Sequence, residues 1–472
     1  MNLRAISYYI GLFCFPLSFL AFLNILYSSY FDYFLNTDSY SITLIASLLL
    51  GFVFYSFGKE YDKKINFHEQ LILIILIYII TSSFIAIPYY LSNYQISLID
   101  SFFESFSGVT GTGFSIFENI KYLDPTLIIW RSSSQWIGGL YFLIFLILFF
   151  SNSQFYYKLN HLVFSGDKSN NPELNIKGIS LKLFFIYVFL TFCIFFLFSL
   201  SGIRLFNGLN LSMTIISAGG FLPTNSLNDI IKTTIQEFFL VLSFLVAILN
   251  IFFIYNLFNK KFFLKEHYED FAIFALMILF SIILLLSGNN LDILTVFSNI
   301  FSSISTSGIS GNKIVNNFSL FLLFLTIIGG SLISNTSGIK FIRFYILLKS
   351  AFTEILKLVR PNNIVDKNIL ISNKKINNEN IKISFLIFIS FFISLFILSG
   401  VLLLDNINFE KSFKLSILTL TNTTNSDLYS LGFIEFRNLL TSSKLSIIIF
   451  MIIGKIELIS IFLIIKKIFF KN

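Results

Sequence analysis

Four short stretches of small and hydroxyl-bearing residues are the part of this sequence most able to do chemistry. They read Thr110-Gly111-Thr112-Gly113, Ser217-Ala218-Gly219-Gly220, Ser305-Thr306-Ser307-Gly308 and Thr421-Asn422-Thr423-Thr424. Glycine permits unusual backbone angles and close approach, so the carbonyl and hydroxyl oxygens of such loops can face one point. Oxygens gathered in that way can replace the hydration shell of a cation. A single stretch of this kind is usually only a connection, whereas four copies indicate a shared site.

Each stretch follows a short segment that is typical of an amphipathic helix, and each pair lies between two long apolar runs. The expected short helices span 101–107, 205–215, 293–303 and 409–418. A short helix that enters a membrane and turns back points its partly negative C-terminal end at the loop that follows. The alternative is that the loops are plain external connections, and four copies in one register argue against it.

The composition indicates a membrane protein with many spans. Of 472 residues, 56% are hydrophobic and 12% are charged, whereas soluble domains carry about 25% charged residues. The mean hydropathy is +0.82. A transmembrane helix needs about 20 mostly apolar residues. Ten segments qualify, namely 6–27, 41–57, 65–91, 125–150, 179–201, 230–258, 271–287, 320–348, 383–404 and 444–469.

These segments predict an all-α polytopic membrane protein with four span–pore loop–span repeats around a central pore, and with two accessory N-terminal spans. The expected units are 1–60 for the accessory helices, then 65–152, 177–258, 268–350 and 380–470 for the repeats. Lysines gather after the second, fourth, sixth and eighth spans and at the C-terminal end. Because basic residues favour the cytoplasmic side, we expect both termini to be cytoplasmic.

The eighth expected span is interrupted by Gly329, Gly330 and a polar run from Ser334 to Ser337. Polar backbone at membrane depth is tolerated where it lines water or is buried in protein. The alternative interpretation is a small-residue face on which helices pack.

Charged residues within expected spans are costly and indicate function by default. Arg131 either has such a role or reaches the outer interface with its long side chain. We expect Glu457 to neutralise Arg343 or Lys340 across the bundle, and Glu104 to brace the first loop rather than to bind an ion.

Covalent chemistry is not expected from this sequence. The three histidines fall in polar connecting segments and the two cysteines in apolar runs, so neither a metal cluster nor a disulfide framework is indicated. Paired catalytic acids, which a membrane transferase would need, are not visible. A coupled secondary transporter typically has inverted repeats, whereas these repeats run in one direction.

Four stretches resemble the Trk/Ktr/HKT superfamily of potassium transporters, and most closely its bacterial TrkH type. They are 103–113 (FESFSGVTGTG), 131–139 (RSSSQWIGG, similar to RSxxQWIGG), 338–343 (GIKFIR, similar to GGIKxxR) and 454–457 (GKIE, similar to GRLE). With the repeats, the resemblance covers about residues 65–470.

The resemblance implies K⁺ uptake across the bacterial inner membrane through a four-loop filter with an intramembrane gate. The filter would consist of Thr110, Gly111, Thr112, Gly113, Ser217, Ala218, Gly219, Gly220, Ser305, Thr306, Ser307, Gly308, Asn422, Thr423 and Thr424. The gate would consist of Gly329, Gly330, Ser334, Asn335, Ser337, Gly338, Lys340 and Arg343, with Glu457 in support. It also implies a homodimer that docks a cytoplasmic nucleotide-binding subunit of the TrkA type, with no organic cofactor in this chain.

Two departures from the family pattern bear on selectivity and gating. The fourth loop has no glycine, so Thr424 stands where the other loops have Gly113, Gly220 and Gly308. This leaves open a sodium-permeable transporter, or one coupled to Na⁺ or H⁺, of the same fold. The segment 333–338 reads ISNTSG where the family has GSTAGG.

Overall fold

The computed structural model describes residues 2–59, 61, 65–151, 176–258, 267–287, 292–311, 318–359, 376, 378–405 and 407–456. Within these ranges the chain forms helices and loops and no β-strand. The α-helices are α1 Leu3–Tyr30, α2 Thr37–Gly58, α3 Phe67–Tyr90, α4 Leu98–Thr110, α5 Pro125–Ser151, α6 Ile176–Leu200, α7 Leu205–Ile216, α8 Thr234–Ile248, α9 Ile251–Phe258, α10 Tyr268–Ser287, α11 Ile293–Ile304, α12 Ser319–Ile328, α13 Phe341–Val359, α14 Asn378–Leu402, α15 Phe409–Leu420 and α16 Thr441–Ile456. Short 3₁₀ turns are η1 Ile120–Tyr122, η4 Leu227–Asp229, η6 Leu403–Asp405, η7 Asp427–Tyr429 and η8 Phe436–Asn438.

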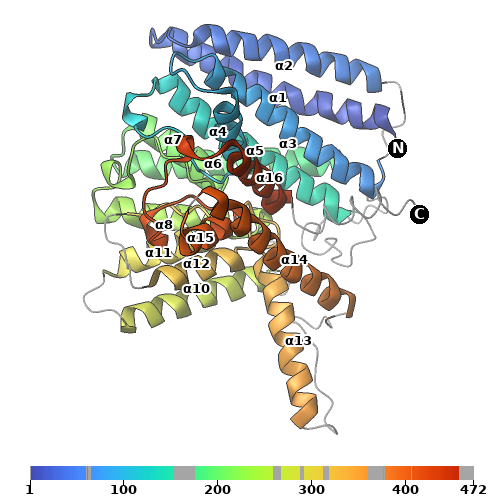
Figure 1. Cartoon of the computed structure of the whole chain (residues 1–472), viewed down its shortest axis with the longest axis vertical. Coiled ribbons are helices and arrows are strands. Elements are labelled where there is room, and N and C mark those ends of the chain that lie inside the picture. The colour runs from blue at the N-terminus through green and yellow to red at the C-terminus, as the bar shows by residue number, and fades with distance from the viewer. Residues whose placement is uncertain are drawn as a thin grey trace.

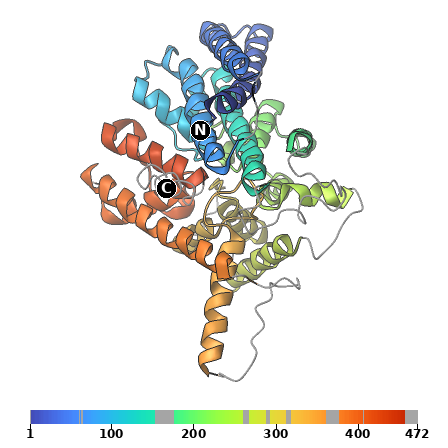
Figure 2. The ribbon, with the colours of Figure 1, turned by 90° about the vertical axis from the view of Figure 1, so that its right-hand side faces the viewer.

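Helices α1 and α2 form a hairpin at one side of the molecule (Figures 1 and 2). Glycines let the two backbones touch, since a Cβ on Gly11 would lie 2.6 Å from the backbone nitrogen of Tyr55. The hairpin is fixed to the start of α5 by buried polar side chains. Asn24 donates to the carbonyl of Thr126 at 3.2 Å, and Asn36 donates to Asp124 at 3.1 Å.

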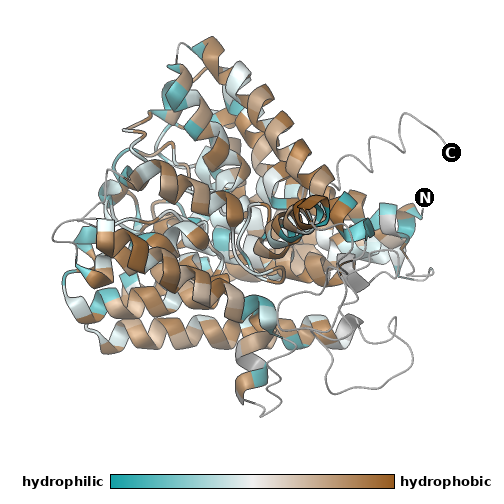
Figure 3. Cartoon of the chain, turned by 90° about the horizontal axis from the view of Figure 1, so that it is seen from below, coloured by the Kyte–Doolittle hydropathy of each residue, from teal (hydrophilic) through white to brown (hydrophobic). Residues whose placement is uncertain are grey.

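The remaining helices follow the predicted order of long helix, short helix, loop and long helix. Six described helices are long and apolar enough to cross a membrane, namely Leu3–Tyr30, Thr37–Gly58, His68–Tyr90, Gly178–Leu200, Tyr268–Ser287 and Asn378–Asp405. Their outward faces are mostly hydrophobic, and paler, more polar segments lie between them (Figure 3). Helix α13 projects from the body (Figures 1 and 2). The short helices α4, α7, α11 and α15 lie at the expected places and extend slightly beyond the predicted bounds.

The expected span 230–258 is wrong as one continuous helix, because it is broken between α8 and α9. Leu249 is extended, with φ −77° and ψ 161°. The side-chain oxygen of Asn250 then accepts the backbone N–H of Phe252 at 3.0 Å, which is how an asparagine begins a new helix. Hydropathy does not reveal such a break, because both halves are apolar.

The expected span 320–348 is also two helices, α12 and α13, joined by a buried loop of residues 329–340. Gly329 (φ 66°), Gly338 (φ 82°) and Lys340 (φ 75°) have positive φ, which ends the helical path. For the last expected span, 444–469, the structure describes α16 as far as Ile456.

Two glycines bring a long helix directly against the end of a short one. A Cβ on Gly138 of α5 would lie 1.9 Å from the carbonyl oxygen of Val109 in α4. A Cβ on Gly454 of α16 would lie 2.2 Å from the carbonyl oxygen of Leu420 in α15. In both the first and the fourth repeat, a glycine in the long helix therefore allows close contact with the C-terminal end of the short helix.

Gly138→Ala is expected to reduce the thermal unfolding midpoint of the purified protein clearly, because overpacking a tight contact costs about 1–3 kcal/mol. Gly400→Ala on α14 is the matched control, since a Cβ there meets nothing within 4 Å and alanine is the better helix former. Equal midpoints for the two variants would show that α4 and α5 are not in this contact.

Candidate functional site

The four predicted loops turn away from their short helices in the same way. The second residue of each has left-handed backbone geometry, with φ 81° at Gly111, 55° at Ala218, 58° at Thr306 and 49° at Asn422. The N–H of each bonds back to a carbonyl three residues earlier, as Gly111 does to Gly108 at 2.9 Å. The shared break fixes one register, in which Thr424 corresponds to Gly113, Gly220 and Gly308.

Hydroxyl groups stiffen three of the loops. The hydroxyls of the first and third residues pair at 2.8 Å between Thr110 and Thr112, and at 2.9 Å in both the Ser305–Ser307 and Thr421–Thr423 pairs. In the second loop the third position is Gly219, which carries no hydroxyl group. The Thr110 hydroxyl also lies 2.7 Å from the carbonyl of Phe106, so the loop is tied to its own helix.

The four loops close a ring, which we call the loop ring after its members Gly113, Gly220, Gly308 and Thr424. A Cβ on Gly113 would lie 2.8 Å from the Cα of Gly220, and one on Gly220 would lie 2.9 Å from the carbonyl oxygen of Ser307. A Cβ on Gly308 would lie 2.8 Å from the carbonyl oxygen of Thr424. The Thr424 hydroxyl completes the circuit by donating to the carbonyl of Gly113 at 2.9 Å.

The fourth repeat is fastened to the first by side chains as well. The Asn422 amide donates to the Thr112 hydroxyl at 3.0 Å and to the carbonyl of Met451 in α16 at 2.9 Å. Further from the ring, Lys444 of α16 forms a buried ion pair with Asp100 of α4 at 2.6 Å. The last described helix, α16, therefore contacts α4 of the first repeat.

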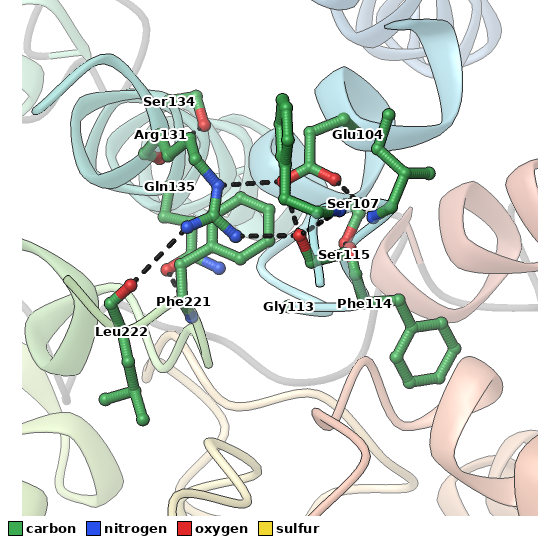
Figure 4. Close-up of polar contacts among 12 residues, drawn as sticks. Glu104, Ser107, Gly113, Phe114, Ser115, Arg131, Ser134, Gln135, Phe221 and Leu222 are labelled. Atoms are coloured by element: carbon green, nitrogen blue, oxygen red, sulfur yellow. Dashed lines mark hydrogen bonds and ion pairs between the residues drawn. The ribbon is translucent and has the colours of Figure 1, made fainter. Parts of the chain in front are cut away.

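A buried ion pair supports the first loop (Figure 4). The Arg131 guanidinium of α5 binds the Glu104 carboxylate of α4 at 2.8 Å, and these side chains are 1% and 0% exposed. Glu104 also accepts the backbone N–H of Ile116 at 2.9 Å and the Ser115 hydroxyl at 3.1 Å. Glu104 therefore braces the loop, and Arg131 is a buried partner rather than an interfacial residue.

The same face of α5 holds the second loop (Figure 4). Arg131 donates to the carbonyl of Leu222 at 3.4 Å, and its guanidinium carbon lies 4.1 Å from the ring centre of Phe221. One helical turn further, the Gln135 amide oxygen accepts the N–H of Phe221 at 3.2 Å. Arg131 and Gln135 thus position two neighbouring loops of the ring.

The 329–340 loop lies directly against the third loop of the ring and against the end of α7, which leads into the second loop. The Asn335 amide donates to the carbonyl of Ile216, at the end of α7, at 2.7 Å. The N–H of Ser337 donates to the Thr306 hydroxyl of the third loop at 3.1 Å. Asn335 and Ser337 are 4% and 3% exposed, so this loop is packed against the ring and not displayed on the surface.

Lys340 lies inside the loop that it ends. Its ammonium group donates to the carbonyls of Ser331, Ser334 and Thr336 and to the hydroxyls of Ser334 and Thr336, at 2.5–3.3 Å. A buried ammonium satisfied in this way organises the oxygens around itself. Arg343 is buried in the first turn of α13.

Lys455 of α16 reaches the same place from the fourth repeat. Its ammonium donates to the carbonyl of Asn335 at 2.9 Å and lies 4.6 Å from the ring centre of Phe142. A Cβ on Gly111 would lie 3.8 Å from it. The Lys455 amine therefore lies between the first loop and the 329–340 loop. Glu457, which the sequence suggested as the partner of Lys340 or Arg343, lies outside the described residues.

Sequence reasoning missed several residues that hold this site. Gln135 lay within a recognised motif, but its partner Phe221 is distant in sequence. Glu269 and Asp270 begin an apolar helix, where acids are ordinary, and nothing local showed that Glu269 contacts the 329–340 loop or that Asp270 contacts the break between α8 and α9. His267 was expected in a polar connection, yet it is fully buried.

Comparison with known proteins points to one family. A model of the TrkH family, described as a cation transport protein, matches residues 37–257. An uncharacterized cation transporter of Methanocaldococcus jannaschii is 26% identical over 91% of this chain and 90% of its own length. The potassium uptake protein TrkH of Escherichia coli is 24% identical over 69% of this chain and 70% of its own length.

The solved structures give the same answer for the fold. The crystal structure of the potassium transporter TrkH from Vibrio parahaemolyticus superposes with a TM-score of 0.83 and covers 98% of both chains, at 19% sequence identity. The motifs, the family match and the fold agree in what this chain is similar to, namely membrane transporters of the Trk/Ktr/HKT type and not enzymes.

Proposed function

We propose that this protein takes up K⁺ across the inner membrane of a bacterium, through a filter formed by the four loops. The observation that carries the proposal is the closed circuit of contacts from Gly113 to Gly220, to the third loop, to Thr424 and back to the Gly113 carbonyl. Carbonyls from four directions can replace the hydration shell of a monovalent cation. The potassium uptake named for its relatives agrees with this.

The 329–340 loop is the gate in this proposal. It packs against the end of α7 through Asn335 and against the third filter loop through Ser337, and the side-chain amines of Lys340 and Lys455 bind its carbonyls. Because side-chain hydrogen bonds and not helical backbone hydrogen bonds hold this loop, it can move while α12 and α13 remain intact. Moving Asn335 away would also shift the point where Lys455 is bound.

The proposal includes an assembly and an orientation. The chain forms a homodimer with both termini in the cytoplasm and docks a nucleotide-binding regulatory subunit of the TrkA type. The resemblance to Trk systems supports the partner, and the lysine-rich segments 259–267 and 349–382 suit a cytoplasmic face. Mass measurement of the purified protein, alone and with such a subunit, tests both parts.

The test of transport is cation flux through the purified protein in lipid vesicles, with K⁺ and Na⁺ gradients set against each other. We expect K⁺ to carry most of the flux. Flux that is equal for the two ions, or that favours Na⁺, would support the sodium-permeable alternative. Flux that follows an imposed proton gradient would support coupling.

Thr424→Gly is expected to raise the K⁺-to-Na⁺ permeability ratio severalfold. The Thr424 hydroxyl donates a hydrogen bond to the Gly113 carbonyl oxygen, so this oxygen is less available to an ion. A glycine at position 424 would remove that hydrogen bond. Thr424→Ser is the matched control, because it keeps the hydroxyl and removes only the methyl group. An increase with serine as large as with glycine would assign the effect to the methyl group instead.

A further inference from the structure

Two adjacent acids at the start of α10, Glu269 and Asp270, hold backbone groups of two other segments. The Glu269 carboxylate accepts the N–H of Leu332, in the 329–340 loop, at 2.9 Å. The Asp270 carboxylate accepts the N–H of Asn250, at the break between α8 and α9, at 2.8 Å. These side chains are 5% and 2% exposed, respectively. We call Glu269 and Asp270 the acid pair.

The two segments held by the acid pair are also bonded to each other. The N–H of Ser331 donates to the carbonyl of Ile248 at 3.0 Å, and the N–H of Ile251 donates to the carbonyl of Ile333 at 3.1 Å. The first limb of the loop, residues 331–333, is therefore paired with the helix break. The second limb, which carries Asn335 and Ser337, contacts the end of α7 and the third filter loop instead.

Asp270 of the acid pair is also held by His267 and, through it, by α9. Asp270 also binds the Nδ1 of His267 at 3.0 Å, and the Nε2 of His267 lies 3.1 Å from the side-chain amide of Asn256 in α9. His267 and Asn256 are 0% and 7% exposed. A continuous set of buried polar contacts thus runs from α9, through α10, to the loop next to the filter.

We propose that the acid pair consists of positioning residues that set the closed position of the gate, with Glu269 holding the loop and Asp270 holding the helix break against which the loop is paired. This inference rests on the proposed gate. Glu269 acts by its acceptor oxygen, because a buried backbone N–H that loses its acceptor is left unsatisfied. Losing it favours the open position of the loop by roughly tenfold or more.

The experiment compares K⁺ efflux from vesicles that contain the purified full chain or its variants. Glu269→Leu removes the acceptor, and we expect an initial efflux rate about tenfold above that of the unmodified protein. Glu269→Gln keeps an amide oxygen facing Leu332 and is expected to remain within about twofold. Glu379→Leu is the matched control, since Glu379 lies in the first turn of α14 and is exposed.

A purely structural role would lower efflux and the thermal unfolding midpoint together, whereas a positioning role raises efflux. If Glu269→Leu does not fold, Glu269→Asp, which keeps the charge but is shorter by one methylene, takes its place. Unchanged efflux in a folded variant, or the same rise with Gln as with Leu, would overturn the inference.

Hydrogen–deuterium exchange separates this inference from the proposed function, because it needs no transport. The amides of residues 331–337 are expected to exchange about tenfold faster in Glu269→Leu than in the unmodified protein or in Glu379→Leu. If the unmodified protein shows no efflux but Glu269→Leu shows the faster exchange, the transport proposal is contradicted and the role of Glu269 is still supported. Unchanged exchange would count against Glu269 whatever the flux.

Discussion

Arg131→Met is expected to remove most of the folded protein and to abolish K⁺ flux through what remains. The substitution leaves the Glu104 carboxylate, which is 0% exposed, without its cation. Removing one partner of a buried ion pair costs about 3–5 kcal/mol, which is a large part of the stability of a typical domain. It also removes the bond to the Leu222 carbonyl, so the first and second loops of the ring lose a shared anchor.

The measurement is the yield of monodisperse protein in detergent together with flux in vesicles. Arg437→Met, in the exposed turn η8, is the matched control and should behave as the unmodified protein. The double variant Glu104→Gln with Arg131→Met should recover part of the yield, because no buried charge is left alone and the Gln oxygen can still accept the Ile116 N–H. Full flux in Arg131→Met would contradict the role given to this pair.

Lys340→Met is expected to leave the gate open, with K⁺ efflux at least tenfold above that of the unmodified protein. Three carbonyls of the 329–340 loop, those of Ser331, Ser334 and Thr336, lose the ammonium that binds them. The Ser331 carbonyl keeps the hydrogen bond from the Ser334 hydroxyl at 2.6 Å, so the loss falls mainly on the carbonyls of Ser334 and Thr336. Each buried acceptor left without a donor costs about 1–3 kcal/mol. The compact loop should therefore give way to arrangements in which these oxygens reach water.

Vesicle efflux at fixed protein content measures this effect, and the thermal midpoint shows whether the variant remains folded. Lys357→Met is the matched control, because Lys357 lies on α13 and forms only a partly exposed pair with Glu354. Lys340→Arg should not restore the closed state fully, since the planar guanidinium cannot occupy the centre of the same oxygens. Efflux of Lys340→Met no higher than that of Lys357→Met would contradict the idea that the ammonium keeps the loop closed.

The four repeats could be predicted from the sequence because their signals are local. The small-residue loops, the short amphipathic helices before them and the apolar runs around them all lie within a few tens of residues. The left-handed residues Gly111, Ala218, Thr306 and Asn422 occur where the alignment of the loops requires them. The register that sets Thr424 against three glycines therefore followed from the order of residues within the loops.

The contacts that hold the site could not be predicted in the same way. Hydropathy gives the depth of a residue but not its neighbours, so Glu269 and Leu332, which are 63 positions apart, gave no common signal. The break at Leu249 and Asn250 was hidden within a continuous apolar run. Glu457 was expected to neutralise Lys340 or Arg343, whereas the structure surrounds the Lys340 ammonium with the oxygens of its own loop.

The central claim is that the loop ring is where the cation binds, and a structure determined in Tl⁺, which substitutes for K⁺ and scatters strongly, tests it most directly. We predict a thallium site enclosed by the backbone of all four loops, next to Gly113, Gly220, Gly308 and Thr424. Thallium bound elsewhere along the chain, with none at the ring, would contradict the claim.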